Sequence, residues 1–309
     1  MKVGLTAATY NLYQGSSLIP AYLAADLAQM AEELRGAYRR MIDTDVPGRA
    51  AAIAGQLAGH RPEALGVQEA ARWRRGDEVC DFLEILLDAL RRAGLDYRVA
   101  ATATASSLAV HTGGDVVGMT DRDAILVRGD VPVTAAGDRV FAARIEQPVP
   151  SGLVLTKLRG WAWADLGIGD RELRVVSTHL EAFDEKVRCR QAEELADALD
   201  GDGRSAVVLG DLNSAPGEDA HAVLAERGFA DAWAGAQGSA DGFTALQAGT
   251  LDNEESQLSM RWDHILVRSP GLVADAASVI GADPGARLPS GLWPSDHAGL
   301  VATLVRSGG

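Results

Sequence analysis

Side chains that could catalyse a hydrolysis recur where strand-like stretches of the sequence begin or end. Strand ends are where α/β proteins place functional groups, because the sheet fixes the backbone while loops shape access. The positions that follow or precede such stretches are Asn11, Glu69, His179, Asp211, Asn213, Asp263, Asp296 and His297. We therefore take these eight residues as the candidate site.

The carboxylates and amides in this set favour a hard divalent cation. Glu69, Asp211 and Asp296 offer carboxylate oxygens, and Asn11 and Asn213 add neutral amides. Oxygen donors of this kind suit Mg²⁺ or Mn²⁺, whereas Zn²⁺ prefers histidine and cysteine. The cofactor that the sequence predicts is therefore Mg²⁺ or Mn²⁺.

The two histidines supply the proton chemistry. His179 and His297 could act as general base or acid, or could donate hydrogen bonds to phosphoryl oxygens. A carboxylate such as that of Asp263 could orient one imidazole ring. In-line attack of water on a phosphoester requires this combination, because a metal neutralises the developing oxyanion and a base activates the water.

Each residue taken alone also has a purely structural explanation. The Asp-x-Asn stretch at Asp211 favours an Asx turn. Glu69 could be an N-cap partner, and His179 could be a hydrogen-bonded core histidine. Only the joint occurrence of these residues at successive strand ends favours a catalytic site.

Length and charge narrow the class of protein. The 309 residues are 47% hydrophobic and 23% charged, which is typical of one large globular α/β domain. No apolar run reaches the roughly 18 residues of a membrane helix, so we expect no stable membrane insertion. No secretion signal stands at the N-terminus, which predicts a cytoplasmic protein or a mature one whose signal has been removed. The net charge of −14 disfavours a large nucleic-acid footprint, although a small positive cleft is compatible with it.

Hydrophobic periodicity predicts alternating strands and helices along the whole chain. We expect strands over residues 3–11, 64–68 and 206–209, and helices over 19–41, 78–93 and 184–199. The charged run Arg72–Arg75 is expected to be a solvated loop, and residues 271–294 to be loop-rich. Residues 19–41 are expected to pack on a sheet, with a lid or lipid-facing helix as the alternative. The mixed pattern predicts packed layers of sheets and helices.

Six short motifs occur in a familiar order: Thr9-Tyr10-Asn11-Leu12, Gly66-Val67-Gln68-Glu69, Ser177-Thr178-His179-Leu180-Glu181, Gly210-Asp211-Leu212-Asn213-Ser214, Arg261-Trp262-Asp263-His264-Ile265 and Ser295-Asp296-His297-Ala298-Gly299-Leu300. With them the chain resembles the endonuclease/exonuclease/phosphatase superfamily, the DNase I-like metal-dependent phosphoesterases. The resemblance implies an α/β fold, a four-layer α/β/β/α sandwich with the site at one edge. It implies a single domain over residues 1–309, with a helical insertion at about 14–60.

The resemblance also assigns roles to the candidate residues. Glu69, with Asn11 beside it, matches the principal metal carboxylate, and Asp296 a metal-side carboxylate. The Gly-Asp-x-Asn element implies that Asp211 and Asn213 position the attacking water and the phosphate. His297, paired with Asp263, matches the general base or phosphate-binding histidine, and His179 matches a second histidine that contacts a phosphate oxygen.

Two departures from the family pattern leave alternatives open. The penultimate motif often reads Arg-Ile-Asp-Tyr, and His264 in place of the tyrosine is expected to be a strand residue rather than a ligand. Either Asp121 or Asp123 could orient His179. An arginine that grips phosphate is not evident, with Arg144 and the run Arg72–Arg75 as candidates.

The activity we expect from the sequence is a metal-dependent phosphodiesterase that acts by in-line attack of water. Its partner would be a phosphoester substrate, namely a small molecule, a nucleotide or a lipid headgroup. The alternatives are a metal-dependent endonuclease or exonuclease on nucleic acid, and a non-catalytic binding protein on the same fold. The Ala-, Arg- and Gly-rich composition suggests a bacterial source, and the sequence leaves the oligomeric state open.

Overall fold

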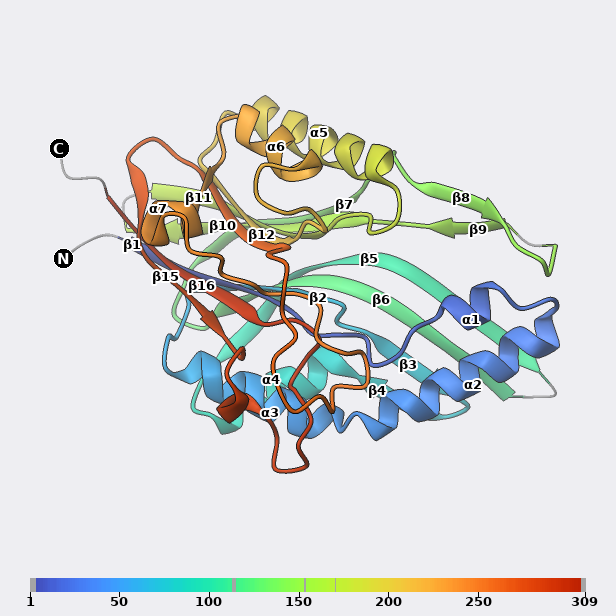
Figure 1. The fold of residues 1–309 in the computed structure, drawn as a ribbon. Helices are drawn as coiled ribbons and strands as arrows, with labels where there is room; N and C mark the ends of the chain where they lie inside the picture. Colours follow the sequence, from blue (N-terminus) through green and yellow to red (C-terminus); the bar gives the residue numbers. More distant parts are fainter. Residues whose placement is uncertain (1–3, 113–114, 153, 170, 307–309) are drawn as a thin grey trace.

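Two β-sheets pack face to face and carry helices on their outer faces (Figure 1). The computed structural model describes residues 4–112, 115–152, 154–169 and 171–306. This arrangement confirms the predicted α/β/β/α sandwich. Residues 1–3 and 307–309 of the predicted domain, including the predicted strand residue Val3, lie outside the described residues.

The larger sheet has eight strands. Its order is β15 (Leu272–Ile280), β16 (Gly299–Arg306), β1 (Gly4–Asn11), β2 (Ala64–Gln68), β6 (Asp115–Arg128), β3 (Arg72–Arg75) and β4 (Glu78–Asp81), and β5 (Tyr97–Thr112) also pairs with β6. Only β1 and β2 run parallel among the described pairs of this sheet. Asn11 and Glu69 therefore emerge at the same edge.

The second sheet has six strands. Its order is β13 (Ala230–Asp231), β14 (Asp263–Arg268), β12 (Ala206–Asp211), β11 (Arg171–His179), β10 (Gly160–Ile168) and β7 (Val133–Val140). Here β11 and β12 are the parallel pair, so that His179 and Asp211 share an edge in the same way. A separate ribbon of β8 (Ile145–Pro148) and β9 (Val154–Lys157) extends from this sheet.

Helices cover the outer face of each sheet. The larger sheet is covered by α3 (Val46–Ala58) and α4 (Phe82–Arg92), whose apolar faces bury Leu57 and Leu90 against it. The smaller sheet is covered by α5 (Glu185–Asp202) and α6 (Asp219–Glu226), with α7 (Ala232–Gln237) near one end. A short 3₁₀ helix spans Pro284–Ala286. Among the described residues, no helix is both long enough and apolar enough to cross a membrane.

The predicted helix over residues 19–41 is wrong in its continuity. The chain forms α1 (Ile19–Tyr22) and then α2 (Leu27–Asp43), because the side chain of Asp26 caps α2 by accepting a hydrogen bond from Gln29 N. The apolar face of α2 packs on the sheet as expected, with Met30 and Leu34 fully buried. Both helices and α3 lie within the segment predicted as a helical insertion.

Three other predictions of local structure need correction. The run Arg72–Arg75 is strand β3, because Trp73 between the arginines is fully buried and anchors the run in the sheet. The helix predicted from residue 78 begins only at Phe82, where Asp81 is the N-cap. The segment predicted as loop-rich begins with β15, which pairs along its length with β16.

The two sheets are in close contact behind the predicted motifs. Gln68 Nε2 donates to Ser177 Oγ across the interface at 3.1 Å. At Gly66 an added Cβ would stand 2.8 Å from Leu209 Cβ and 3.1 Å from Ser177 Oγ. The glycine of the Gly-Val-Gln-Glu motif therefore sets the distance between the sheets.

Gly66→Ala is predicted to destabilise the protein by about 1–3 kcal/mol, because the new methyl group overpacks the interface between the sheets. Urea unfolding followed by circular dichroism measures this. Gly55→Ala is the matched control, because Gly55 is exposed on α3 with open space around it. That variant should be slightly more stable than the wild type. Equal stabilities for the two variants would contradict the close contact at Gly66.

Candidate active site

Strand register brings the predicted residues to one edge of the sandwich. In the larger sheet Asn11 pairs with Gln68, and Glu69 follows directly. In the smaller sheet Asp211 is the register partner of His179 on one side and of Asp263 on the other. The chemistry-bearing positions of six separate motifs thus meet because each motif ends or begins a strand.

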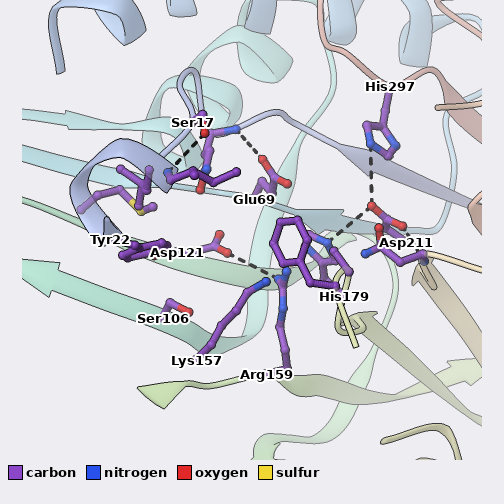
Figure 2. Close-up of a pocket in the computed structure, with 17 residues that line it drawn as sticks. Ser17, Tyr22, Glu69, Ser106, Asp121, Lys157, Arg159, His179, Asp211 and His297 are labelled. Carbon is purple, nitrogen blue, oxygen red and sulfur yellow. Dashed lines mark hydrogen bonds and ion pairs between the residues drawn. The ribbon is translucent and has the colours of Figure 1, made fainter. Parts of the chain in front are cut away.

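Asp211 is the centre of this constellation (Figure 2). Only 1% of its surface is exposed. Its Oδ2 accepts a hydrogen bond from Asn11 Nδ2 at 3.1 Å and lies 3.5 Å from His179 Nε2 and 3.8 Å from His297 Nε2. Its Oδ1 accepts from the Asn213 backbone N–H at 2.9 Å. Both imidazole rings therefore face one carboxylate.

Asn11 connects the two sheets at this point. Its Nδ2 also lies 3.3 Å from Glu69 Oε1, so that one amide bridges the carboxylates of Glu69 and Asp211. Glu69 Oε2 accepts from the Gln14 backbone N–H at 2.7 Å. Glu69 and Asn213 both adopt left-handed backbone conformations, with φ of 53° and 48°. Non-glycine residues rarely adopt this conformation, and it is common at functional sites.

The carboxylates around His297 favour its protonated form. Its Nδ1 donates to Asp263 Oδ2 at 2.8 Å, which leaves Nε2 directed at Asp211. Burial alone would lower the pKa of His297, but the carboxylates of Asp263 and Asp211 outweigh burial and hold it well above its ordinary value. The pair predicted from the sequence, Asp263 with His297, is thus in contact.

His179 has the opposite character. Burial lowers its pKa well below the ordinary value, and the nearby positive charges of Arg159 and Lys157 lower it further. Its Nδ1 has no hydrogen-bond partner. Neither Asp121 nor Asp123 therefore bonds to that nitrogen, and the contact of the ring is with Asp211 instead. The surroundings of the two imidazoles therefore shift their pKa values in opposite directions.

The carboxylates fit a divalent cation. Burial raises the pKa of Asp296 to about 7, and the negative charges of Glu69 and Asp211 contribute to the rise while His297 and Arg49 oppose it. Burial also raises the pKa of Asp211. Like charges gathered in a buried region are costly unless a cation compensates them. An oxygen-rich set of this kind matches the donors that Mg²⁺ and Mn²⁺ prefer.

A cavity of about 180 Å³ opens beside these residues. Its walls include Glu69, His179, Asp211, Asn213 and His297. The walls also include residues that the sequence analysis did not assign to the site: Gln14, Ser17, Leu18, Ile19, Tyr22, Ser106, Met119, Lys157, Arg159, Ala182 and Phe183. Helix α1 contributes Ile19 and Tyr22 to these walls, whereas α2, the longer part of the same predicted segment, packs on the sheet.

The cationic side chains in the cavity are Lys157 and Arg159 rather than the predicted candidates. Arg144 forms an exposed ion pair with Glu146 at 2.8 Å, and none of Arg72, Arg74 and Arg75 is among the lining residues. The signal that could have found the pair is the spacing of two in Lys157-Leu158-Arg159, which places alternate side chains of an extended chain on one face.

A second cluster of His221, Asp231 and His264 also has the spacing of a metal site. The polar atoms of this cluster already have ion-pair or hydrogen-bond partners within the protein. Asp231 Oδ2 pairs with Arg261 Nη1 at 2.8 Å, and His264 Nε2 donates to Ser214 O at 2.9 Å. The Gly217 N–H donates to His221 Nδ1 at 3.0 Å. The cluster therefore holds the loop after Asp211 in place through hydrogen bonds. His264 is a strand residue, as predicted.

Comparison with known proteins agrees with this geometry. Residues 8–297 match the model of the Endonuclease/Exonuclease/phosphatase family. The chain belongs to this family. Members of the family are generally phosphoester hydrolases, typically dependent on a divalent metal. No curated protein matches the chain.

Solved structures of the family share the fold at low sequence identity. A family protein from Bacteroides thetaiotaomicron is 19% identical with a TM-score of 0.65, and the match covers 100% of both chains. The mannosyl-6-phosphatase from the same species is 20% identical over 97% of this chain and 99% of that chain, with a TM-score of 0.61. Truncated TDP2 from Caenorhabditis elegans is 19% identical over 98% of each chain, with a TM-score of 0.55.

Asp231→Ala is predicted to destabilise the protein by about 3 kcal/mol, because it leaves the buried Arg261 guanidinium without its carboxylate partner. Urea unfolding measures the change. Asp88→Ala is the matched control, since Asp88 pairs with Arg91 and Arg92 on the exposed face of α4. It should cost under about 1 kcal/mol. Stabilisation of the wild type by Zn²⁺, lost in Asp231→Ala, would instead show that the cluster binds metal.

Proposed function

We propose that the protein is a phosphodiesterase that depends on Mg²⁺ or Mn²⁺ and acts by in-line attack of water on a small phosphoester. The observation that carries the proposal is the convergence of His179 and His297 on Asp211 beside the Asn11–Glu69 pair. A turn residue or a core histidine would have no reason to meet the others in this way.

In this proposal, Asp211 holds the attacking water and accepts its proton. Its Oδ2 faces the cavity between the two imidazoles, and burial raises its pKa, which makes the carboxylate a better base. The backbone N–H of Asn213 fixes the other carboxylate oxygen, so that Oδ2 keeps one orientation. Asn213 itself lines the cavity where a phosphoryl oxygen would lie.

The two imidazoles would then bind the phosphate in different ways. His297, held protonated by Asp263 and Asp211, donates from Nε2 to a phosphoryl oxygen that gains charge in the transition state. His179 stays neutral and offers a hydrogen bond without adding charge. Environments that push the pKa values of two like groups apart are typical of such a difference in role.

Glu69 and Asp296 would hold the cation, with Asn11 as the neutral amide of the set. When bound, the cation supplies charge neutralisation at a phosphoryl oxygen. Asn11 Nδ2 bonds to the carboxylates of both Glu69 and Asp211. A cation held by Glu69 would therefore lie next to the attacking water held by Asp211.

The size of the cavity and the net charge both favour a small substrate. A cavity of about 180 Å³ suits a small phosphoester better than a long polymer. The net charge of −14 repels long nucleic acid over most of the surface. The similar mannosyl-6-phosphatase from Bacteroides thetaiotaomicron makes a sugar phosphate monoester a useful second probe.

The test is hydrolysis of bis-(p-nitrophenyl) phosphate, p-nitrophenyl phosphate, mannose 6-phosphate and plasmid DNA with Mg²⁺, Mn²⁺ or EDTA. We expect release from the diester that EDTA abolishes. Asp211→Asn and His297→Ala should each lower kcat/KM by roughly 10²- to 10⁴-fold, because each removes a group that acts in the transition state.

Arg144→Gln is the control, because Arg144 lies in an exposed ion pair and should keep full activity. Thermal unfolding shows that the site variants remain folded. Hydrolysis of the monoesters alone would assign a phosphatase, and plasmid nicking alone a nuclease. Full activity in a folded Asp211→Asn variant would refute the proposed mechanism.

A further inference from the structure

Two cationic side chains in the cavity have no part in the reaction proposed above. Arg159 has 5% of its surface exposed, and its Nε and Nη1 have no hydrogen-bond partner. The nearest carboxylate, Asp121, has its Oδ2 3.7 Å from Nη1, which is too long for a direct hydrogen bond. Buried guanidinium groups normally have hydrogen-bond acceptors for their N–H groups. The unpaired Nε and Nη1 of Arg159 therefore indicate that a ligand binds there.

Lys157 stands beside Arg159 in the same wall. Its Nζ lies 3.2 Å from Glu181 Oε1 and 4.5 Å from the centre of the Phe183 ring. Burial lowers the pKa of Lys157 to about 8, and the neighbouring Arg159 charge lowers it further, against the opposing effect of Glu181. Two like charges kept together in a buried wall are costly unless an anion pairs with both.

The carboxylates nearby satisfy only part of this pair, because Lys157 donates to Glu181 but Nε and Nη1 of Arg159 bond to none of them. Both carboxylate oxygens of Asp123, Oδ1 of Asp121 and Oε2 of Glu181 also lack hydrogen-bond partners. Burial raises the pKa of Asp121 to about 6, against the lowering effect of Arg159, which weakens Asp121 as a counter-ion. If Arg159 served only to neutralise these acids, its Nε and Nη1 would be in contact with carboxylate oxygens, and they are not.

Lys157 and Arg159 lie apart from Asp211, where the proposed reaction takes place. Figure 2 shows the Arg159 head group between Asp121 and His179, on the far side of His179 from Asp211. Neither Lys157 nor Arg159 is in ion-pair contact with Asp211 or Glu69 in the described structure. An anion held by the pair would therefore neighbour the group at Asp211 without being the same group.

We propose that Lys157 and Arg159 form a subsite for a second phosphate group of the substrate, separate from the scissile phosphoester. The planar guanidinium presents two parallel donors to a phosphate, and the ammonium adds a point charge. This inference rests on the proposed function, because it assumes that the phosphoester is cleaved at Asp211. The substrate class is then a small phosphoester that carries an additional phosphate.

The test compares two chromogenic substrates that differ by one phosphate. Thymidine 5′-(p-nitrophenyl phosphate) carries the scissile diester alone, and its 3′-phosphorylated form adds a second phosphate on the same small scaffold. We expect the wild type to show a kcat/KM at least about tenfold higher on the 3′-phosphorylated substrate. Lys157→Gln and Arg159→Gln should move that ratio toward one.

Arg144→Gln is the matched control, because it removes a positive charge outside the cavity and should leave the ratio unchanged. Lys157 is partly exposed, so that Lys157→Gln keeps the test decisive even if the buried Arg159→Gln variant does not fold. A wild-type ratio near one, or an equal loss on both substrates in Lys157→Gln, would overturn the subsite.

Calorimetry separates this inference from the proposed function, because it needs no turnover. Thymidine 3′,5′-bisphosphate should bind the wild type at least about tenfold more tightly than thymidine 5′-monophosphate, and Lys157→Gln should abolish the difference. A binding preference without hydrolysis would support the subsite and refute the phosphodiesterase. Hydrolysis without any preference would support the phosphodiesterase and refute the subsite.

Discussion

The buried carboxylate of Asp211 is the group on which the site depends. A carboxylate with 1% of its surface exposed is tolerated only if hydrogen-bond donors and positive charge surround it. Those partners come from both sheets: Asn11 from β1, His179 from β11, and His297 from the segment before β16. Stabilising this one charge therefore requires the two sheets to be packed and in register.

The fold meets this requirement through two parallel strand pairs and one close contact. Each sheet contains a parallel pair, β1 with β2 and β11 with β12, whose carboxyl ends open at the same edge. Gly66 and the Gln68–Ser177 hydrogen bond set the separation of the sheets just behind that edge. Gly210 has a related role, because a Cβ there would meet the carbonyl oxygen of Thr178. The glycines of two motifs thus serve packing, and the acidic residues that follow serve the site.

Much of this arrangement could be predicted because it is local in the sequence. A buried apolar run followed by a carboxylate, as at Val67-Gln68-Glu69, predicts both a strand and a functional end. The order of six such ends indicated the family and its sandwich. The contact between Asp263 and His297, 34 residues apart, followed only from the family resemblance.

The remainder depends mainly on contacts between segments that lie far apart in the sequence. Lys157 and Arg159 enter the cavity because of where the β8–β9 ribbon meets β10, and the sequence there resembles any short polar strand. The break between α1 and α2 depends on the cap at Asp26. Trp73 turns an arginine-rich run into strand β3 because α2 packs over it, with Tyr38 edge-on to the indole at 6.4 Å. Tertiary packing overrides local preference at each of these positions.

We propose that the acidic edge around Asp211 holds one divalent cation on the Glu69 side. Anomalous diffraction from crystals soaked in Mn²⁺ tests it most directly, since it locates the ion without any assumption about substrate. We expect a single strong peak within coordination distance of Glu69 and Asp296, absent from crystals of Glu69→Gln. A peak at His221 and His264 instead, or no peak at the Asp211 edge in well-diffracting crystals, would contradict it.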